Sequence, residues 1–470
     1  MKRFSAAIVG AFAWFAAFAQ TPATYTSLYT DLPVEVAPVT PVSFPSRTAS
    51  ITAHGAVGDA VTLNTLPIQQ CIDSLASLGG GTVEIPGGVW LTGPLELRSN
   101  ICLNLAPTAI LYFSPDKALY YDGPDTRFKP CITARDCTNI GITGRGLIDG
   151  NGAQWRPVKR GKVSDTEWSR FKDMGGVERG DGGMWYPWQL RSGYPDMMPT
   201  PEKQESKRND LFRVFDCRNI LLKDVTFQNA PKFHVHPFNS ENIIIDGITV
   251  RCPWNAQNGD AIDLSDCHSC LIVGATVDAG DDGLCLKSGT RKDDTPINGV
   301  HDVLIQDCVV YAAHGGFVIG SEDICGIERV VCRDCRFSGT ETGLRFKSAI
   351  TRGGRTADIY ISRISMTDII HSAIVFECTY NLANANVKPG EVDTSKPYNI
   401  PEFTDIHISD IVCRGCKTGV SASGIKGFDC VHGIDISRST FVYTREATAI
   451  DTATASVKLT DVNFVADRKQ

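Results

Sequence analysis

A short strand-like unit recurs along the second half of the chain, and this repeat restricts the possible folds more than any other feature. Each unit, such as ENIIIDGITV, alternates apolar and polar residues and is rich in β-branched types. Turn-forming Asn, Gly and Asp separate the units. Most units follow one another after about 23 to 33 residues, with one longer step. They begin at Arg218, Glu241, His268, His301, Glu328, Ala357, Thr404, His432 and Ala455.

A period of two residues indicates strands and argues against stacked helix pairs. A β-propeller is disfavoured because it needs about four strands in every forty-odd residues. We therefore expect an all-β fold, a parallel β-helix or solenoid in which each repeat forms one coil and equivalent positions stack about 4.8 Å apart. In that register Cys308 and Cys335 share an inward column with Ile248, Ala275, Ile364 and Ile411.

The first coil of such a solenoid has an open edge that needs a cover. A helix with Thr65 as its N-cap, running through Leu78 to three glycines, would provide an N-terminal capping helix. Its apolar face would consist of Ile68, Cys71, Ile72 and Leu75. We expect short strands to follow at Thr82–Ile85, Val89–Leu91, Leu95–Leu97 and Ile101–Leu105.

The first nineteen residues are typical of a secretory signal. Lys2 and Arg3 precede an apolar stretch, and Ala17-Phe18-Ala19 forms a small-x-small cleavage site. The stretch is short for a membrane anchor, and no second apolar run follows. We predict a signal peptide at 1–19, an arm or linker at 20–49 and one β-helix catalytic domain at 50–470. The mature protein is then secreted or periplasmic, without a membrane partner.

The chain has 17 cysteines, an odd number that leaves at least one unpaired. Export would permit disulfides, and two CxxC spacings allow a zinc site as a weaker alternative. Many cysteines, however, stand where Ile or Val would fit in the apolar runs. We interpret most of them as small buried hydrophobic residues, among them Cys270, Cys308, Cys332 and Cys335.

An irregular insertion at about 153–208 interrupts the repeats. It contains Trp155, Trp168, Trp185 and Trp188 among many charged residues, and this aromatic content argues against disorder. Exposed tryptophans would serve as platforms for sugar rings, whereas buried ones would form a local core. Both roles are compatible with the sequence.

Charged residues follow four successive repeat units, each a short way past the end of its unit. Three are carboxylates, which repel one another when ionised on a shared face. One carboxyl would then keep its proton as a general acid while the others activate water. Stacked coils would bring all these groups into one row: Asp260, Asp281, Asp282, His314, Arg345 and Lys347.

The motifs around these residues are Asn258-Gly-Asp260, Gly280-Asp-Asp282, Ala313-His-Gly315 and Arg345-Phe-Lys347. They resemble, in order, the Asn-Thr-Asp, Gly/Gln-Asp-Asp, Gly-His-Gly and Arg-Ile-Lys motifs of the polygalacturonase family of glycoside hydrolases. These pectin-degrading enzymes are right-handed parallel β-helices. Gly259 and Ala313 depart from the family pattern, but both are small enough to keep the backbone. The likeness covers about residues 50 to 465 except the insertion.

The resemblance implies inverting hydrolysis of an α-linked galacturonic acid. Asp281 would protonate the leaving oxygen, and Asp260 and Asp282 would hold and deprotonate the attacking water. His314 would tune the protonation of Asp281. The substrate would be contacted by Asn258, Arg345, Lys347 and Tyr380, with the two cations pairing with a substrate carboxylate.

The insertion beside the cleft would close one end and favour exo action on pectic poly- or oligosaccharides. We expect a monomer without metal or other cofactor, and the net charge of −7 argues against nucleic acid as a partner. Two alternatives are a pectic lyase, in which the three Asp bind Ca²⁺ and Lys347 is the base, and a glycan-binding β-helix without catalysis.

Overall fold

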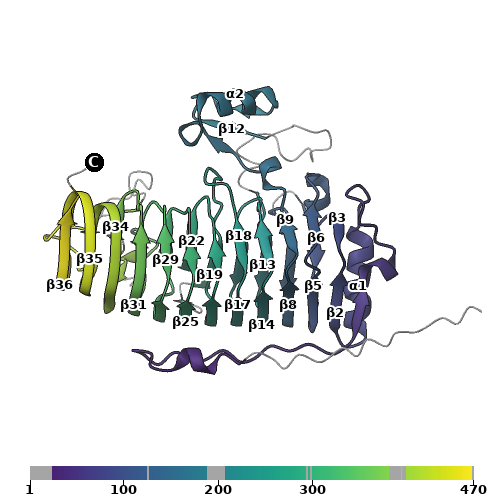
Figure 1. Cartoon of the computed structure of the whole chain (residues 1–470), viewed down its shortest axis with the longest axis horizontal. Coiled ribbons are helices and arrows are strands. Elements are labelled where there is room, and N and C mark those ends of the chain that lie inside the picture. Colours follow the sequence, from purple (N-terminus) through teal and green to yellow (C-terminus); the bar gives the residue numbers. More distant parts are fainter. Residues whose placement is uncertain are drawn as a thin grey trace, which may run out of the picture.

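The computed structural model describes residues 24–123, 126–187, 207–289, 291–292, 295–296, 299–380, 393 and 399–467. The predicted signal peptide and Trp188 lie outside the described residues. The chain forms a long stack of coils that runs from α1 to β36 (Figure 1). Its main sheet has 31 strands, paired in parallel between successive coils. The predicted all-β, right-handed parallel β-helix is thereby confirmed.

Three stacks of strands, here named A, B and C, form the walls of the coils. Stack A contains β1 (Thr48–Ser50), β2 (Gly81–Ile85), β5 (Ile101–Leu105), β8 (Thr138–Gly144), β14 (Arg218–Lys223), β17 (Glu241–Asp246), β20 (His268–Val273), β25 (Val300–Gln306), β28 (Ile327–Arg333), β31 (Arg355–Thr367), β34 (Ile406–Ser423), β35 (Val431–Ile450) and β36 (Ala455–Ala466). Stack B contains β3 (Gly88–Thr92), β6 (Ala109–Phe113), β9 (Leu147–Asp149), β15 (Thr226–Gln228), β18 (Thr249–Arg251), β21 (Thr276–Val277), β26 (Val309–Val310) and β29 (Arg336–Ser338). Stack C contains β4 (Leu95–Glu96), β7 (Ile132–Arg135), β13 (Phe212–Phe215), β16 (Val235–Phe238), β19 (Ile262–Ser265), β22 (Asp282–Ser288), β27 (Gly315–Asp323), β30 (Leu344–Lys347) and β32 (Ser372–Glu377). The short strand β33 (Glu402–Phe403) pairs with β31 and β35 of stack A, whereas β23 (Arg291–Lys292) and β24 (Thr295–Pro296) form a separate two-stranded sheet.

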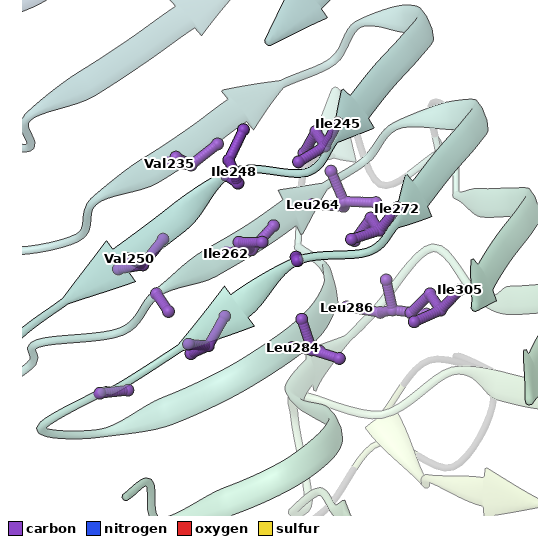
Figure 2. Packing of buried hydrophobic residues seen from close by; sticks show 14 of the residues in the cluster. Val235, Ile245, Ile248, Val250, Ile262, Leu264, Ile272, Leu284, Leu286 and Ile305 are labelled. Atoms are coloured by element: carbon purple, nitrogen blue, oxygen red, sulfur yellow. The ribbon is translucent and has the colours of Figure 1, made fainter. Parts of the chain in front are cut away.

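Inward-pointing apolar side chains form one continuous core along the coils. Ile245, Ile272 and Ile305 occupy paired positions of β17, β20 and β25 (Figure 2). They lie beside Leu264 and Leu286 of stack C (Figure 2). Stacking like residues in register in this way buries apolar surface on every coil.

The cysteines contribute to this core as predicted. All 17 are free thiols, and all except Cys325 are buried. Cys308 and Cys335 are fully enclosed together with the other members of the predicted inward column, Ile248, Ala275, Ile364 and Ile411.

Helix α1 (Thr65–Ser77) covers the first coil, as predicted, and buries Ile68, Cys71, Ile72 and Leu75. The prediction of Thr65 as N-cap is wrong, because Asn64 holds that position and Thr65 is the first helical residue. The Thr65 hydroxyl instead accepts a hydrogen bond from Gly93 N, which ties the helix to the following coil.

The arm N-terminal to β1 runs along the outer side of stack A (Figure 1). Asn242 fixes it there, accepting a hydrogen bond from Thr40 N at 2.8 Å and donating one to Thr40 O at 3.1 Å. The arm covers an outward apolar stripe with Val36, Val39 and Val42, which pack on Ile244, Leu271, Leu304 and Val331.

The insertion, predicted to be irregular, carries regular elements of its own. Helix α2 (Asp165–Asp173) begins with a capping box at Ser164, and an antiparallel sheet has the order β10 (Val158–Lys159), β12 (Met184–Tyr186), β11 (Val177–Glu178). Figure 1 shows this unit projecting beyond the coils.

The described tryptophans of the insertion are packing residues, not exposed sugar platforms. Trp168 and Trp185 form a small core with Val158, and Trp155 is buried against Tyr120 at a ring distance of 5.0 Å. No helix in the described part of the chain has the length and apolarity required to cross a membrane.

Candidate active site

Stack C brings the predicted acids together because equivalent positions of its strands lie above one another. Ile262 of β19 pairs with Leu284 of β22. Asp260 and Asp282 each lie two residues before this paired position, so they occupy equivalent places on adjacent coils. One carboxylate oxygen from each of Asp260, Asp281 and Asp282 lies within 4.8 Å of the other two.

His314 joins the cluster from the next coil. Its Nδ1 lies 2.9 Å from Oδ1 of Asp281, and its backbone N donates to Asp281 O at 2.7 Å. Asp281 is the most open of the three acids, with 15% of its side chain exposed. Asp281 and His314 are therefore one unit at the edge of the cluster.

Arg345 and Lys347 do not occupy the position in their coil that the sequence analysis expected. Leu344 of β30 is the position equivalent to Ile262 and Leu284. Arg345 and Lys347 come after it, whereas Asp260 and Asp282 come before the equivalent positions of β19 and β22. Their side chains nevertheless reach the acids. Lys347 Nζ donates to Asp282 Oδ2 at 2.6 Å, and Arg345 Nη1 lies 3.8 Å from Asp282 Oδ1.

Lys287 is a site residue for which the sequence analysis predicted no role. Its Nζ donates to Asp260 Oδ2 at 2.8 Å and to Asp263 of the same coil. Lys287 lies three residues after Leu284 of β22, and Lys347 lies three residues after the equivalent Leu344 of β30. This shared offset is the sequence signal that would have identified it.

Two carboxylate oxygens of the cluster remain without a hydrogen bond from the described part of the chain, although Arg345 Nη1 lies 3.8 Å from one of them, Asp282 Oδ1. Oδ1 of Asp260 and Oδ1 of Asp282 are buried and accept no hydrogen bond from any described residue. A water that donates both hydrogens, each over about 2.8 Å, spans acceptors about 4.4 Å apart. This span lies within the limit of 4.8 Å that holds between one oxygen of Asp260 and one of Asp282.

The environment pushes the pKa values of two of the acids in opposite directions. Burial raises the pKa of Asp260 well above its usual range. The positive charge of Lys287 acts to lower this pKa, and the negative charge of Asp281 acts to raise it. Burial also acts to raise the pKa of Asp281, but the hydrogen bond and positive charge of His314 outweigh it and lower that pKa. A neutral His314 removes its own charge but keeps the hydrogen bond, and the charges of Lys347 and Lys287 also lower the pKa of Asp281.

His234, which the sequence analysis did not single out, fixes the backbone at Asp260. Its Nδ1 donates to Asp260 O at 2.8 Å, and its Nε2 accepts from Ala230 N at 3.2 Å. One donor and one acceptor require the neutral ring. Burial lowers the pKa of His234 to about 4, which agrees with that state.

Asn258 has a positive φ of 51°, a conformation that Asn tolerates better than most residues. Its Oδ1 accepts from Nη2 of the buried Arg208 at 3.1 Å. Arg208 also donates to the carbonyls of Pro231 and Gln257 at 2.8 and 2.7 Å. The structure thus places Asn258 beside the acids but uses its side chain to hold the loop.

Tyr380 borders the two cations of β30. Its half-buried ring lies 5.2 Å from Lys347 Nζ and 5.6 Å from the Arg345 guanidinium. The cation–π contacts orient the ring at the edge of the cluster.

Three carboxylates at this spacing are chemically suited to a divalent cation. Two of them, however, already accept a hydrogen bond from a lysine ammonium, Asp260 from Lys287 and Asp282 from Lys347. A cation bound to this cluster would therefore compete with two lysines.

Comparison with known proteins identifies relatives of this chain. The model of glycosyl hydrolases family 28 matches residues 162–463. An exo-poly-alpha-D-galacturonosidase of Dickeya chrysanthemi is 26% identical over 82% of this chain, and a probable polygalacturonase of Vitis vinifera is 29% identical over 69%. The alignments span 66% and 62% of those two relatives, just under two thirds of their length.

Solved structures give the same result. A hyperthermoactive exopolygalacturonase of Thermotoga maritima matches with a TM-score of 0.73 and 26% identity, covering 91% of this chain and 94% of that one. The polygalacturonase of Erwinia carotovora shares the fold with a TM-score of 0.61, at 22% identity and 90% and 98% coverage. The chain belongs to family 28 of the glycosyl hydrolases.

Proposed function

We propose that this chain is an inverting glycosidase that releases galacturonic acid from the ends of pectic poly- or oligosaccharides. The observation that carries the proposal is the cluster of three carboxylates, two of them with a buried oxygen that accepts no hydrogen bond from any described residue. The exo-acting relatives from Dickeya chrysanthemi and Thermotoga maritima support the choice of glycan and of exo action.

Asp260 and Asp282 hold the attacking water through their Oδ1 atoms and take its proton as the new bond forms. Burial opposes the ionised form of Asp260 that this role needs, and the ion pair with Lys287 favours it. Asp281 protonates the glycosidic oxygen, because it is the most open of the three acids and can reach a leaving group. Lys287 and Lys347 balance the negative charge that Asp260 and Asp282 carry before the proton is taken.

Arg345 is the main group that binds a substrate carboxylate in this proposal. Lys347 is almost fully buried and committed to Asp282, whereas 18% of the Arg345 side chain is exposed and its closest approach to Asp282 is 3.8 Å. A guanidinium can also bind a carboxylate through two parallel hydrogen bonds. Tyr380 beside it supplies a face for the sugar ring.

The insertion accounts for exo action in this proposal. It reaches the cluster with Lys162, whose Nζ lies 3.0 Å from His314 Nε2. A unit attached at this point limits how far a polysaccharide can extend past the scissile bond. We also propose that the enzyme is exported by its signal peptide, to the periplasm or the medium, and acts as a monomer.

The test is release of reducing sugar from polygalacturonate and its oligomers, with product sizing, for the wild type, Asp281→Asn and Asp278→Asn. Asp278 is a matched control because it lies three residues from Asp281 and its side chain makes no hydrogen bond or ion pair with any described residue. We expect single galacturonates from the wild type and the control, and none from Asp281→Asn. Long oligomers early in digestion would contradict exo action.

Two other outcomes separate the alternatives. An unsaturated, ultraviolet-absorbing product that disappears with a chelator would indicate a lyase. Tight binding of the glycan without any cleavage would indicate a binding protein.

A further inference from the structure

The insertion contributes a charged group to the candidate site. Lys162 ends the short 3-10 helix η5 (Arg160–Lys162), which follows β10. Its Nζ lies 3.0 Å from His314 Nε2 and donates to Gly280 O at 3.3 Å. Arg160 anchors this turn, because its guanidinium donates to Val163 O at 2.9 Å.

The contact restricts the proton on His314. An ammonium group can only donate, so Nε2 must accept and carry no hydrogen. Nδ1 faces Oδ1 of Asp281 at 2.9 Å and is then the protonated nitrogen. A doubly protonated imidazole would direct an N–H at the ammonium. Lys162 thus favours the neutral ring with its proton on Nδ1.

The alternative is that Lys162 gives up its proton and His314 carries the charge. Ordinary lysine and histidine differ by about four pKa units in favour of a charged lysine. Burial lowers the pKa of Lys162, and Lys159 acts in the same direction, while the charges of Asp281 and Glu341 raise it. Glu341 Oε1 lies 3.6 Å from His314 Nε2, so its charge acts on both His314 and Lys162. The ammonium is the form that fits these neighbours.

We propose that Lys162 is a positioning residue that keeps His314 neutral, with its proton on Nδ1, and so leaves Asp281 able to carry the proton for the leaving group. The consequence for Asp281 rests on the proposed function. The insertion then influences the protonation of Asp281 as well as limiting the cleft. Its removal would change the pH dependence of the reaction and the length of the products.

The test compares Lys162→Met, Lys162→Arg and Lys159→Met. Methionine keeps the length of the side chain without charge, and arginine restores a donor that cannot lose its proton. Lys159 is the control, because it lies in the same segment and makes no side-chain hydrogen bond or ion pair with any described residue. Removing its charge favours the ammonium form of Lys162 and so preserves the state proposed here.

Nitrogen NMR of histidine-labelled protein reads the ring directly, with the His314 signal identified by its loss in His314→Gln. We expect the wild type, Lys162→Arg and Lys159→Met to keep an Nδ1-protonated neutral ring to a lower pH than Lys162→Met does. An unchanged titration in Lys162→Met would overturn the proposal.

The pH profile of kcat supplies the functional readout. In Lys162→Met the acid limb should move to higher pH by about one unit or more, with little change in KM, because an imidazolium now lowers the pKa of Asp281. Lys162→Arg should restore the wild-type profile. The NMR result stands even if no pectic substrate is cleaved, so the failure of the positioning role and that of the proposed function are distinguishable.

Discussion

Lys347 Nζ lies 2.6 Å from Asp282 Oδ2, and both side chains are almost fully buried in stack C. The same relation occurs on the neighbouring coil between Lys287 and Asp260, at 2.8 Å. Such a pair is tolerated inside a protein because each charge compensates the other, and removing one partner leaves an uncompensated buried charge.

We therefore expect Lys347→Met to lower the free energy of unfolding by about 3 to 5 kcal/mol. Asp282→Asn in the same chain should restore part of that stability but no activity, since the water loses its base. Urea unfolding followed by circular dichroism measures the change. Lys458→Met is the control, because the Lys458 side chain is 75% exposed in its pair with Asp435 and such pairs contribute about 0 to 1 kcal/mol. Equal losses in both variants would contradict this account.

Asp281→Asn should reduce kcat on natural oligogalacturonates by about 10² to 10⁴-fold, the usual contribution of general acid catalysis. The loss should be much smaller on an aryl galacturonide with an acidic leaving group, because that group departs without a proton. Initial rates on both substrates test this, with Asp278→Asn as the control. A loss of equal size on both would mean that Asp281 does not act as the acid.

The buried His234 should make stability depend on pH. Its pKa is about 4 in the folded chain and about 6.5 when unfolded, so the unfolded chain binds the proton first as the pH falls. The contribution of neutral His234 to the free energy of unfolding is complete above about pH 6.5 and is lost as the pH falls to about 4. It corresponds to about 3 kcal/mol. Burial lowers the pKa of His236 as well, so His236 adds to the loss of stability as the pH falls.

Thermal unfolding midpoints between pH 7 and 4 check this expectation. His234→Gln keeps a donor and an acceptor without a titrating ring, so its midpoint should fall less over that interval than that of the wild type. His407→Gln, which removes a more exposed histidine, is the control and should follow the wild type. Parallel curves for all three proteins would contradict the role of His234.

Most of the fold could be predicted because the repeat encodes register. Once Ile243, Cys270 and Val303 are placed in one column, the positions that follow each strand are fixed as well. Asp260 and Asp282 were predictable for this reason. Sequence motifs do not state how far along a strand a side chain lies, which is why Arg345 and Lys347 were expected at the level of the acids.

Other features of the site depend on contacts that no repeat records. Lys162 comes from an insertion without periodicity, and its position depends on how β10 and η5 fold. Arg208 reaches Asn258 across 50 residues of sequence. The N-cap at Asn64 was missed because both Asn and Thr suit that position and only the chain geometry separates them.

The anomer released first tests how Asp260 and Asp282 use the water between them. Catalytic carboxyl groups of retaining glycosidases lie about 5 to 5.5 Å apart and those of inverting ones about 6.5 to 9.5 Å, so a cluster within 4.8 Å does not follow the simple rule for inversion. We still expect inversion, because Oδ1 of both acids is available to a water and both Oδ2 atoms are neutralised by lysines. Proton NMR of α-linked trigalacturonate should then show β-galacturonic acid first, with mutarotation without enzyme measured as the control. An initial α product would mean that one of the carboxylates attacks the sugar itself.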